Sequence, residues 1–359
     1  MRVHGEIPSS GVVRGFGGST GVRWAGDLRV APSDVSRVMT PALSSMALRF
    51  TPRYQQRVWG GRAFEALLGR DIPEGISVGE SWEAVDRGET QSVLDNVCDG
   101  RISLHTLWTE RQAEIFGSGW ARSERFPLLL KLLDARESLS VQVHPSATEC
   151  ARGFGEPKTE WWHVLDAAPD AAVFAGLRPG VTRPMVEDAL HTGEFEPLLH
   201  RIPVRAGDSL FVPAGRIHAI GAGCLIAEVQ QNSDTTYRVF DWNRAGSDGL
   251  PRELHIKQSL ECINFEDHAP SLAADLREQS FRCDFFSIEG IHLSETFEAG
   301  ALAGAFFLVA QGSVRVGMDE FRRGDFFLLP ARATRVRFSP HDDKTLLLRI
   351  TAPSGTMGG

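Results

Sequence analysis

The chain has few of the features that would place it outside a reducing, aqueous compartment. It has no Cys-x-x-Cys pair, and its cysteines are odd in number: Cys98, Cys150, Cys224, Cys262 and Cys283. This usage is typical of reduced cytosolic thiols and excludes a disulfide framework or a zinc knuckle. No apolar run approaches the ~18 residues that a membrane span needs, and the first residues lack the continuous apolar core of a secretion signal. We therefore expect a cytoplasmic protein with no membrane partner.

The chain also lacks an excess of positive charge. It has 38 Lys and Arg against 46 Asp and Glu, a formal net charge of −8. Proteins that bind nucleic acids need a basic face that gathers phosphates, so we expect no nucleic-acid partner. An anionic metabolite stays possible, because a few cationic side chains in one pocket set the local field. With 359 residues and 42% hydrophobic content, the chain can bury the cores of two domains.

The chain changes character near residue 46. Residues 1–45 are rich in glycine, serine and arginine without a hydrophobic period, so they cannot offset their ordering entropy. We expect them to form a disordered N-terminal extension. The remainder consists mostly of short apolar segments separated by Gly, Pro and Asp, which predicts a mainly β fold. Helices are predicted at 103–117, after the capping residue Ser103, and at about 182–200.

One internal repeat is visible in the second half of the chain. VRAGDSLFVPAGRIHAI at 204–220 resembles FRRGDFFLLPARATRVR at 321–337, and the alignment matches Gly207 with Gly324. A repeat of this length indicates two related β units. Proline and acidic residues interrupt the strand pattern near 265–280, which places the boundary there.

The first copy of the repeat carries the pattern G-x5-P-x-G-x2-H at Gly207, Pro213, Gly215 and His218. This pattern resembles the second signature of the cupin family of jelly-roll barrels. The glycines permit tight turns, and the histidine reaches the barrel interior as a neutral nitrogen donor. In the second copy, Arg332 and Arg335 stand in place of the glycine and the histidine. We therefore expect two jelly-roll (cupin) barrels with a few short helices: a catalytic, metal-binding domain at 46–268 and a degenerate domain without metal at 269–355.

The segment LSVQVHP (139–145) has an unusual polar face. Strand alternation places Ser140, Gln142 and His144 on one side. Taken alone, an edge strand with its polar side in water explains this segment. Together with His218, however, it supplies two histidines beside a carboxamide, and such a set suits a divalent first-row metal.

A carboxylate that could complete the set is Glu160 in EPKTEWWHV. It could equally be a solvated surface acid, which is the usual fate of a glutamate. The neighbouring Trp161 and Trp162 indicate partial burial, where an unpaired charge is costly and a cation is a natural partner. His163 falls on the opposite strand face and is expected to be a core or rim histidine with protein partners.

Six blocks between residues 47 and 355 carry a closer resemblance. They are RVWGG (57–61), VGESWE (78–83), FPLLLKLLDARESLSVQVHP (126–145), KTEWWHVLD (158–166), VPAGRIHAIGAGCLIAEVQQNSDTTYRVFDW (212–242) and ELHIKQSLECINF (253–265). In order and spacing they resemble the short bacterial form of the type I mannose-6-phosphate isomerases. The resemblance implies one zinc ion per chain, with the ligands Gln142, His144, Glu160 and His218.

The resemblance also implies roles for cavity residues. Substrate-binding groups would be Lys131, Ser140 and Arg238, and catalytic groups would be Arg238, Lys158 and Glu228. A lysine inside an apolar strand, such as Lys131, is seldom accidental, because burying an ammonium is costly unless an anion compensates it.

Some of these residues have structural alternatives. Arg238 could instead form an ion pair with Asp234 or Asp241. Glu80 and Glu83, in the block VGESWE, are expected to supply supporting hydrogen bonds or turn caps and no catalytic role.

The function implied by the resemblance is a zinc-dependent aldose–ketose isomerase. It would interconvert mannose 6-phosphate and fructose 6-phosphate through an enediol(ate), with a small sugar phosphate as its partner and a monomer or weak homo-oligomer as its assembly. Two alternatives stay open. Two histidines and a carboxylate also make the facial triad of non-haem iron enzymes, so a metal-dependent bicupin oxygenase is one. A non-catalytic sugar-phosphate-binding cupin is the other, because fold alone does not establish turnover.

Overall fold

The structure, a computed structural model, describes residues 43, 46–97, 102–246, 249–273, 276, 279–300, 302–333 and 335–353. These residues fall within one unit of the chain, Thr40–Gly359. Apart from Leu43, the predicted disordered extension at 1–45 lies outside the described residues, and so does Cys98. The disorder of that extension therefore stays a prediction.

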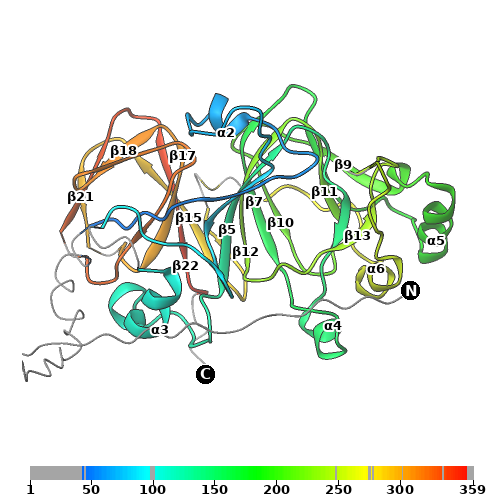
Figure 1. Cartoon of the computed structure of the whole chain (residues 1–359), viewed down its shortest axis with the longest axis horizontal. Coiled ribbons are helices and arrows are strands. Elements are labelled where there is room, and N and C mark those ends of the chain that lie inside the picture. The colour runs from blue at the N-terminus through cyan, green and yellow to red at the C-terminus, as the bar shows by residue number, and fades with distance from the viewer. Residues whose placement is uncertain are drawn as a thin grey trace, which may run out of the picture. The chain divides into compact units, whose positions relative to one another are not determined.

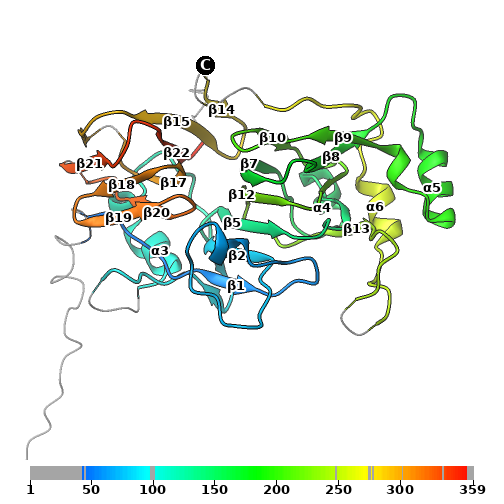
Figure 2. The same ribbon diagram turned by 90° about the horizontal axis from the view of Figure 1, so that it is seen from above.

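Two antiparallel sheets, here called the N-terminal sheets, face each other in the first part of this unit (Figures 1 and 2). In spatial order, the six-stranded sheet contains β1 (Arg53–Gln55), β2 (Glu80–Ala84), β5 (Leu128–Ala135), β12 (Cys224–Gln231), β7 (Glu160–Ala167) and β10 (Ser209–Val212). The five-stranded sheet contains β13 (Tyr237–Phe240), β6 (Val141–Val143), β11 (His218–Ile220), β8 (Ala172–Leu177) and β9 (Leu199–Pro203). A separate two-stranded ribbon pairs β3 (Asp86–Arg87) with β4 (Thr90–Gln91).

Two further antiparallel sheets, the C-terminal sheets, follow in the chain. The five-stranded one contains β14 (Phe281–Arg282), β15 (Ser287–Leu293), β22 (Thr345–Thr351), β17 (Ala305–Gln311) and β20 (Phe326–Leu329). The four-stranded one contains β16 (Phe297–Ala299), β21 (Val336–Pro340), β18 (Ser313–Val316) and β19 (Asp319–Arg322). The mainly β fold is therefore confirmed. The predicted boundary after residue 268 precedes β14, and the division into two domains stays a prediction.

Strand alternation in β5 explains how a charged residue comes to lie inside the N-terminal sheets. Leu130 and Leu132 belong to a core cluster that also contains Phe306 of the C-terminal sheets. Leu133 belongs to a second cluster, which lies between the two N-terminal sheets. Because alternate residues of a strand point to opposite faces, Lys131 shares the face of Leu133 and is directed to the interior of the N-terminal sheets.

The helices are short and lie outside the sheets (Figure 1). They are α2 (Ala63–Ala66), α3 (Leu104–Ile115), α4 (Ala147–Ala151), α5 (Arg183–Thr192) and α6 (Ile256–Cys262), with a 3-10 turn at Glu196–Leu198. The predicted helix at 103–117 is confirmed as α3, and the Ser103 side chain accepts a hydrogen bond from Thr106 N. The predicted helical segment at about 182–200 is not continuous. It is interrupted because α5 ends at Gly193 in a left-handed conformation, with φ of 77°.

The internal repeat corresponds to a repeated turn before a strand. Gly207 and Gly324 have φ of 94° and 88°, a region that favours glycine, and each is followed by a strand, β10 or β20. Gly215 in the first copy also has a positive φ, of 87°. The alignment of the two segments therefore reflects the same local geometry.

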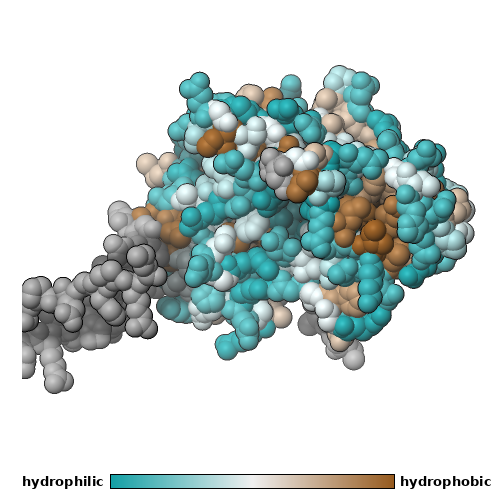
Figure 3. Space-filling view, turned by 45° about the vertical axis from the view of Figure 1, so that its right-hand side comes forward, coloured by the Kyte–Doolittle hydropathy of each residue, from teal (hydrophilic) through white to brown (hydrophobic). Residues whose placement is uncertain are grey.

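The face drawn in Figure 3 is largely hydrophilic, with its most extended group of hydrophobic side chains on the right-hand side and smaller groups elsewhere. Within the part of the chain that the structure describes, no helix is both long enough and apolar enough to span a bilayer.

Candidate metal centre and active-site cavity

Three strands of the five-stranded N-terminal sheet bring predicted site residues together. Gln142 in β6 is the register partner of His218 in β11 on one side and of Arg238 in β13 on the other. Register partners in antiparallel strands project from the same face of a sheet. Residues that are 76 and 96 positions beyond Gln142 in the numbering therefore become its neighbours.

The facing six-stranded sheet contributes the carboxylates. Glu160 is the first residue of β7 and pairs with Gln230 in β12. Glu228, two residues earlier in β12, is the register partner of Lys131 in β5. The two N-terminal sheets thus bring cationic, acidic and imidazole side chains into one interior space.

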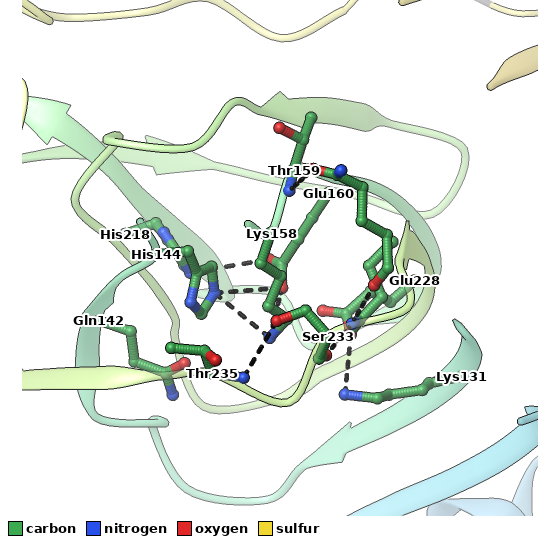
Figure 4. A network of polar contacts seen from close by, with 12 residues as sticks. Lys131, Gln142, His144, Lys158, Thr159, Glu160, His218, Glu228, Ser233 and Thr235 are labelled. Atoms are coloured by element: carbon green, nitrogen blue, oxygen red, sulfur yellow. Dashed lines mark hydrogen bonds and ion pairs between the residues drawn. The ribbon is translucent and has the colours of Figure 1, made fainter. Parts of the chain in front are cut away.

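At the centre of this space, His144, Glu160 and His218 form a candidate metal centre, and their ligand atoms lie within 4.8 Å of one another. It is the one such group among the residues that the structure describes. All three are buried. The Nε2 atoms of His144 and His218 lie 3.2 Å and 3.7 Å from the two carboxylate oxygens of Glu160 (Figure 4).

Burial sets the charge state of both histidines. It lowers the pKa of His144 to about 3, and the nearby Lys158 ammonium acts in the same direction. Burial also lowers the pKa of His218, although Glu160 opposes the shift. Neutral imidazoles can offer a nitrogen lone pair to a metal. The Nδ1 of His218 lies 2.9 Å from Arg216 O, so it carries the proton and leaves Nε2 as the free acceptor.

Glu160 stays ionised. Its burial alone would raise its pKa, but Lys158 and His144 together hold the pKa well below its usual range. Among the described residues, neither oxygen of Glu160 accepts a hydrogen bond of good geometry. A carboxylate and two neutral imidazoles are oxygen and nitrogen donors of the kinds that divalent first-row metals bind. The donor set therefore fits a divalent cation.

Lys158 supplies the positive charge nearest to this centre. Its Nζ lies 2.8 Å from Glu160 Oε1 and 3.3 Å from His144 Nε2. Gln142 lies beside the centre, and its amide nitrogen donates to Ser140 Oγ at 3.2 Å. Its role as a fourth ligand stays a prediction.

A cavity of about 350 Å³ adjoins the candidate metal centre. The predicted ligands Gln142, Glu160 and His218 line it, and His144 reaches the centre from outside the lining. Every predicted substrate-binding and catalytic residue also lines the cavity: Lys131, Ser140, Lys158, Glu228 and Arg238. The structure thus brings together residues that are more than 100 positions apart in the chain.

The Lys131 ammonium has carboxylate partners inside the protein. It lies 3.3 Å from Glu228 Oε1, 3.7 Å from Glu80 Oε2 and 5.5 Å from the ring centre of Trp82. Burial alone would lower the pKa of Lys131, but the two carboxylates raise it. The supporting role expected for Glu80 agrees with its contacts, because it also binds Arg57 Nε at 2.6 Å.

Glu228 has the electrostatic surroundings of a proton acceptor. Its pKa is raised by burial and by the nearby Glu160 carboxylate, against the opposing effect of Lys131. One oxygen accepts a hydrogen bond from Trp162 Nε1 at 3.0 Å. A raised pKa brings a carboxylate closer to the range in which it can exchange a proton at neutral pH.

Among the described residues, the Arg238 side chain forms its hydrogen bond with Glu253 O and is paired with neither Asp234 nor Asp241, the two carboxylates considered as its structural partners. Asp241 instead binds Arg244 at 2.8 Å and Arg252 at 2.7 Å. The guanidinium of Arg238 donates to Glu253 O at 2.6 Å, and its buried Nε has no hydrogen-bond partner among the described residues. Arg238 can therefore accept an anion in the cavity.

Two predictions about residues outside the cavity can also be compared with the structure. His163 is buried, and its Nδ1 lies 3.0 Å from Ser209 Oγ, which confirms a core histidine with a protein partner. Glu83 binds Arg70 Nη1 at 2.5 Å and Ser81 Oγ at 2.6 Å, which agrees with a supporting role.

Sequence reasoning missed several residues that line the cavity. Arg57, Trp59 and Arg252 are among them. Arg57 and Trp59 belong to the block RVWGG, so the block itself was a signal, but nothing in its spacing showed that it reaches the cavity. Arg252 lies just before ELHIKQSLECINF and has no local pattern that could have identified it.

The fold and the site define a cupin-like protein with a candidate metal centre inside a charged cavity. The family described as "Phosphomannose isomerase type I, catalytic domain" matches residues 47–163. The mannose-6-phosphate isomerase ManA of Bacillus subtilis (strain 168) is 35% identical over 302 residues, which cover 80% of this chain and 94% of that protein. A mannose-6-phosphate isomerase of Streptococcus mutans is also 35% identical, over 77% of this chain and 89% of that protein.

A solved structure agrees with these relatives. The crystal structure of the mannose 6-phosphate isomerase from Bacillus subtilis superposes with a TM-score of 0.73 and 30% identity, covering 85% of this chain and 99% of that chain. The chain belongs to the type I phosphomannose isomerases, a family of enzymes. The predicted family is therefore confirmed.

Proposed function

We propose that the protein interconverts mannose 6-phosphate and fructose 6-phosphate and depends on one zinc ion, with Gln142, His144, Glu160 and His218 as ligands. The observation that carries this proposal is the convergence of two neutral imidazoles and an ionised carboxylate beside a cavity of about 350 Å³. Family membership supports the substrate pair. Nitrogen and oxygen donors with one position left open are typical of catalytic zinc.

The isomerisation moves a proton between C1 and C2 and builds negative charge on the substrate oxygens in the enediol(ate). Bound zinc supplies Lewis acidity toward these oxygens or orients them. We assign the proton transfer between carbons to Glu228, because its pKa is raised and it lines the cavity. Lys158 is the second candidate for this step.

Lys158 and Arg238 are proposed to stabilise the oxyanion that develops during the reaction. Preorganised cationic donors in a buried site are the usual means of this stabilisation. Lys158 now neutralises Glu160, and a dication at the candidate metal centre would take over that role and release the ammonium for substrate.

The phosphate group requires cations and hydroxyl donors, for which we propose Arg238, Ser140 and Lys131. Arg238 is the best placed of them, because its contacts are to a main-chain carbonyl and not to a carboxylate. Lys131 already has two carboxylate neighbours, so its proposed contribution is to orient Glu228 as well as to attract the anionic substrate.

A coupled assay with mannose 6-phosphate tests this function. The purified protein is expected to form fructose 6-phosphate, to lose activity after chelation and to recover it when zinc is added back. The absence of turnover at full metal occupancy would exclude the isomerase. In that case, oxygen uptake by the iron-loaded protein would favour the bicupin oxygenase, and sugar-phosphate binding without turnover would favour the non-catalytic cupin.

A further inference from the structure

Two segments that flank the cavity form a pair of connected loops: residues 156–159, which precede β7, and residues 231–235, which begin at the last residue of β12. Ser233 Oγ donates a hydrogen bond to Glu156 O at 3.0 Å. In the opposite direction, Glu156 N donates to Thr235 Oγ1 at 3.0 Å. Figure 4 draws Ser233 and Thr235 together with Lys158 and with Glu160, the first residue of β7. The main chain of the first loop is therefore hydrogen-bonded to two side chains of the second.

The Glu156 side chain lies between two guanidinium groups. One of its oxygens is 2.9 Å from Arg87 Nη1, and the other accepts a hydrogen bond from Arg125 Nη2. Arg87 and Arg125 also donate to the main-chain carbonyl of Asn232, at 2.7 Å and 2.9 Å. We call Arg87, Arg125 and Glu156 the clamp. It holds the first loop through a carboxylate and the second through a carbonyl.

Lys158 lies between two well-held residues of the first loop. Its own main-chain N–H donates a long hydrogen bond of 3.3 Å to Pro145 O. Thr159, on its C-terminal side, exchanges two shorter bonds with Gln231: Thr159 N to the Gln231 side chain at 2.9 Å, and Gln231 N to Thr159 O at 3.1 Å. On its N-terminal side, Glu156 is held by its main-chain hydrogen bonds to Ser233 and Thr235 and by the side-chain contacts of the clamp. The placement of Lys158 therefore depends on Glu156.

The placement of Lys158 matters because its ammonium is buried against the candidate metal centre. Only 4% of the residue is exposed, and Nζ lies 2.8 Å from Glu160 and 3.3 Å from His144. Glu160 depends less on the loop, because it begins β7 and pairs with Val212 on one side and with β12 on the other. A loosened loop would therefore displace the lysine more than the ligand.

We propose that Glu156, held by Arg87 and Arg125, is a positioning residue that places the Lys158 ammonium for the chemical step. The inference rests on the isomerase function proposed above. Groups that orient a catalytic side chain from outside the site typically change activity by about 10-fold or more when they are removed. The clamp thus has a catalytic consequence although its side chains lie outside the cavity lining.

The variant Glu156→Gln tests this role, because it removes the charge and keeps the size. We expect kcat per zinc-loaded protein to fall about 10-fold, while the zinc dissociation constant stays within about twofold of wild type, since Glu160 is held by β7. Glu114→Gln is the control: it breaks an ion pair with Arg111, at 2.8 Å on α3, whose side chains are less exposed than those of the clamp. It should leave kcat unchanged.

Two further variants separate positioning from a merely structural role. Glu156→Asp keeps the charge and should recover more kcat than Glu156→Gln. Arg125→Ala should lower kcat, and the double variant with Glu156→Gln should lose less than the product of the two losses, because both act through one contact. A lowered melting temperature with unchanged kcat in Glu156→Gln would overturn the inference.

The same experiment distinguishes this inference from the function on which it rests. A wild-type protein that binds zinc without isomerising the sugar phosphate would remove the proposed function. An active wild type whose Glu156→Gln variant keeps full kcat would overturn the positioning role alone. A zinc affinity that falls in parallel with kcat would also overturn it, because the clamp would then act through the metal ligands.

Discussion

Lys131 and Glu228 are register partners on adjacent antiparallel strands, and the ammonium of the first lies 3.3 Å from a carboxylate oxygen of the second. Both side chains are buried. Because a buried charge is tolerated only with a partner, neither residue can be replaced without consequences for the other. The relationship joins a substrate-binding candidate to the proposed base, and it leads to predictions about both stability and pH dependence.

Replacing Lys131 by methionine is expected to destabilise the fold. The change leaves Glu228 and Glu80 buried without their common cation, and breaking a buried pair in this way typically costs about 3–5 kcal/mol. Urea denaturation measures the loss, with the exposed Lys344→Met as the control. The double variant Lys131→Met/Glu228→Gln should recover part of the loss, since it removes one stranded charge. A Lys131→Met protein as stable as wild type would contradict this account of the pair.

The acid side of the pH–rate profile should report Glu228. The base must be ionised, and burial raises its pKa, so kcat/KM should fall at a pH above the ordinary glutamate value of about 4.3. Glu80 also raises the pKa of Glu228. The Glu80→Gln variant should therefore move the acid limb to lower pH. A limb that moves to higher pH in this variant would assign it to another group.

Glu80 should also contribute to stability in a defined pH window. Burial would raise its pKa, but Lys131 and Arg57 lower the pKa from 4.5 to about 2. A carboxyl group with a lowered pKa in the folded state stabilises it above the unfolded pKa, and this contribution is lost as the pH falls through the folded pKa. The free energy of unfolding of wild type minus that of Glu80→Gln should therefore shrink from pH 4.5 toward pH 2. A difference that does not change with pH would refute this assignment.

Metal loss and catalytic loss should separate between two variants. His218→Ala removes an imidazole of the candidate metal centre and should abolish zinc binding. Arg238→Ala should keep zinc and lower kcat by about 10²–10³-fold, which is typical when one oxyanion donor is removed. The two measurements are the zinc content of each purified variant, by elemental analysis, and its kcat. Equal metal loss in both variants would make Arg238 a structural residue.

Sequence patterns within short segments predicted the helices and turns that neighbouring residues form with one another. The α3 helix follows from a serine cap and a helical apolar period, and the repeated turn follows from Gly207 and Gly324. The interruption after α5 was missed, although Gly193 is a normal helix terminator. A glycine shows that a helix can end there, but the packing of the following segment decides whether it does.

For the site, the separate segments predicted residue types, and the resemblance to a known family predicted which of them belong together. Strand alternation alone placed Ser140, Gln142 and His144 on one face, and in the structure the first two line the cavity while His144 belongs to the adjoining candidate metal centre. Alternation could not show that Arg238 would become a register partner of Gln142, because pairing between distant strands depends on the whole topology. The partners of Arg238 were likewise undetermined, and Asp241 turned out to bind other arginines.

By itself, the sequence determined which side chains point to the same face of each strand, because the side-chain period of a strand is a property of its covalent backbone. It therefore determined that Lys131, Glu160 and Glu228 could be interior charges. Only the tertiary structure decided which charges compensate one another, because Coulomb energies depend on distances and burial that arise when the two N-terminal sheets close over the cavity. The pairing of Lys131 with Glu228 depends on the register of β5 against β12, and the clamp on Glu156 depends on contacts between segments far apart in the chain.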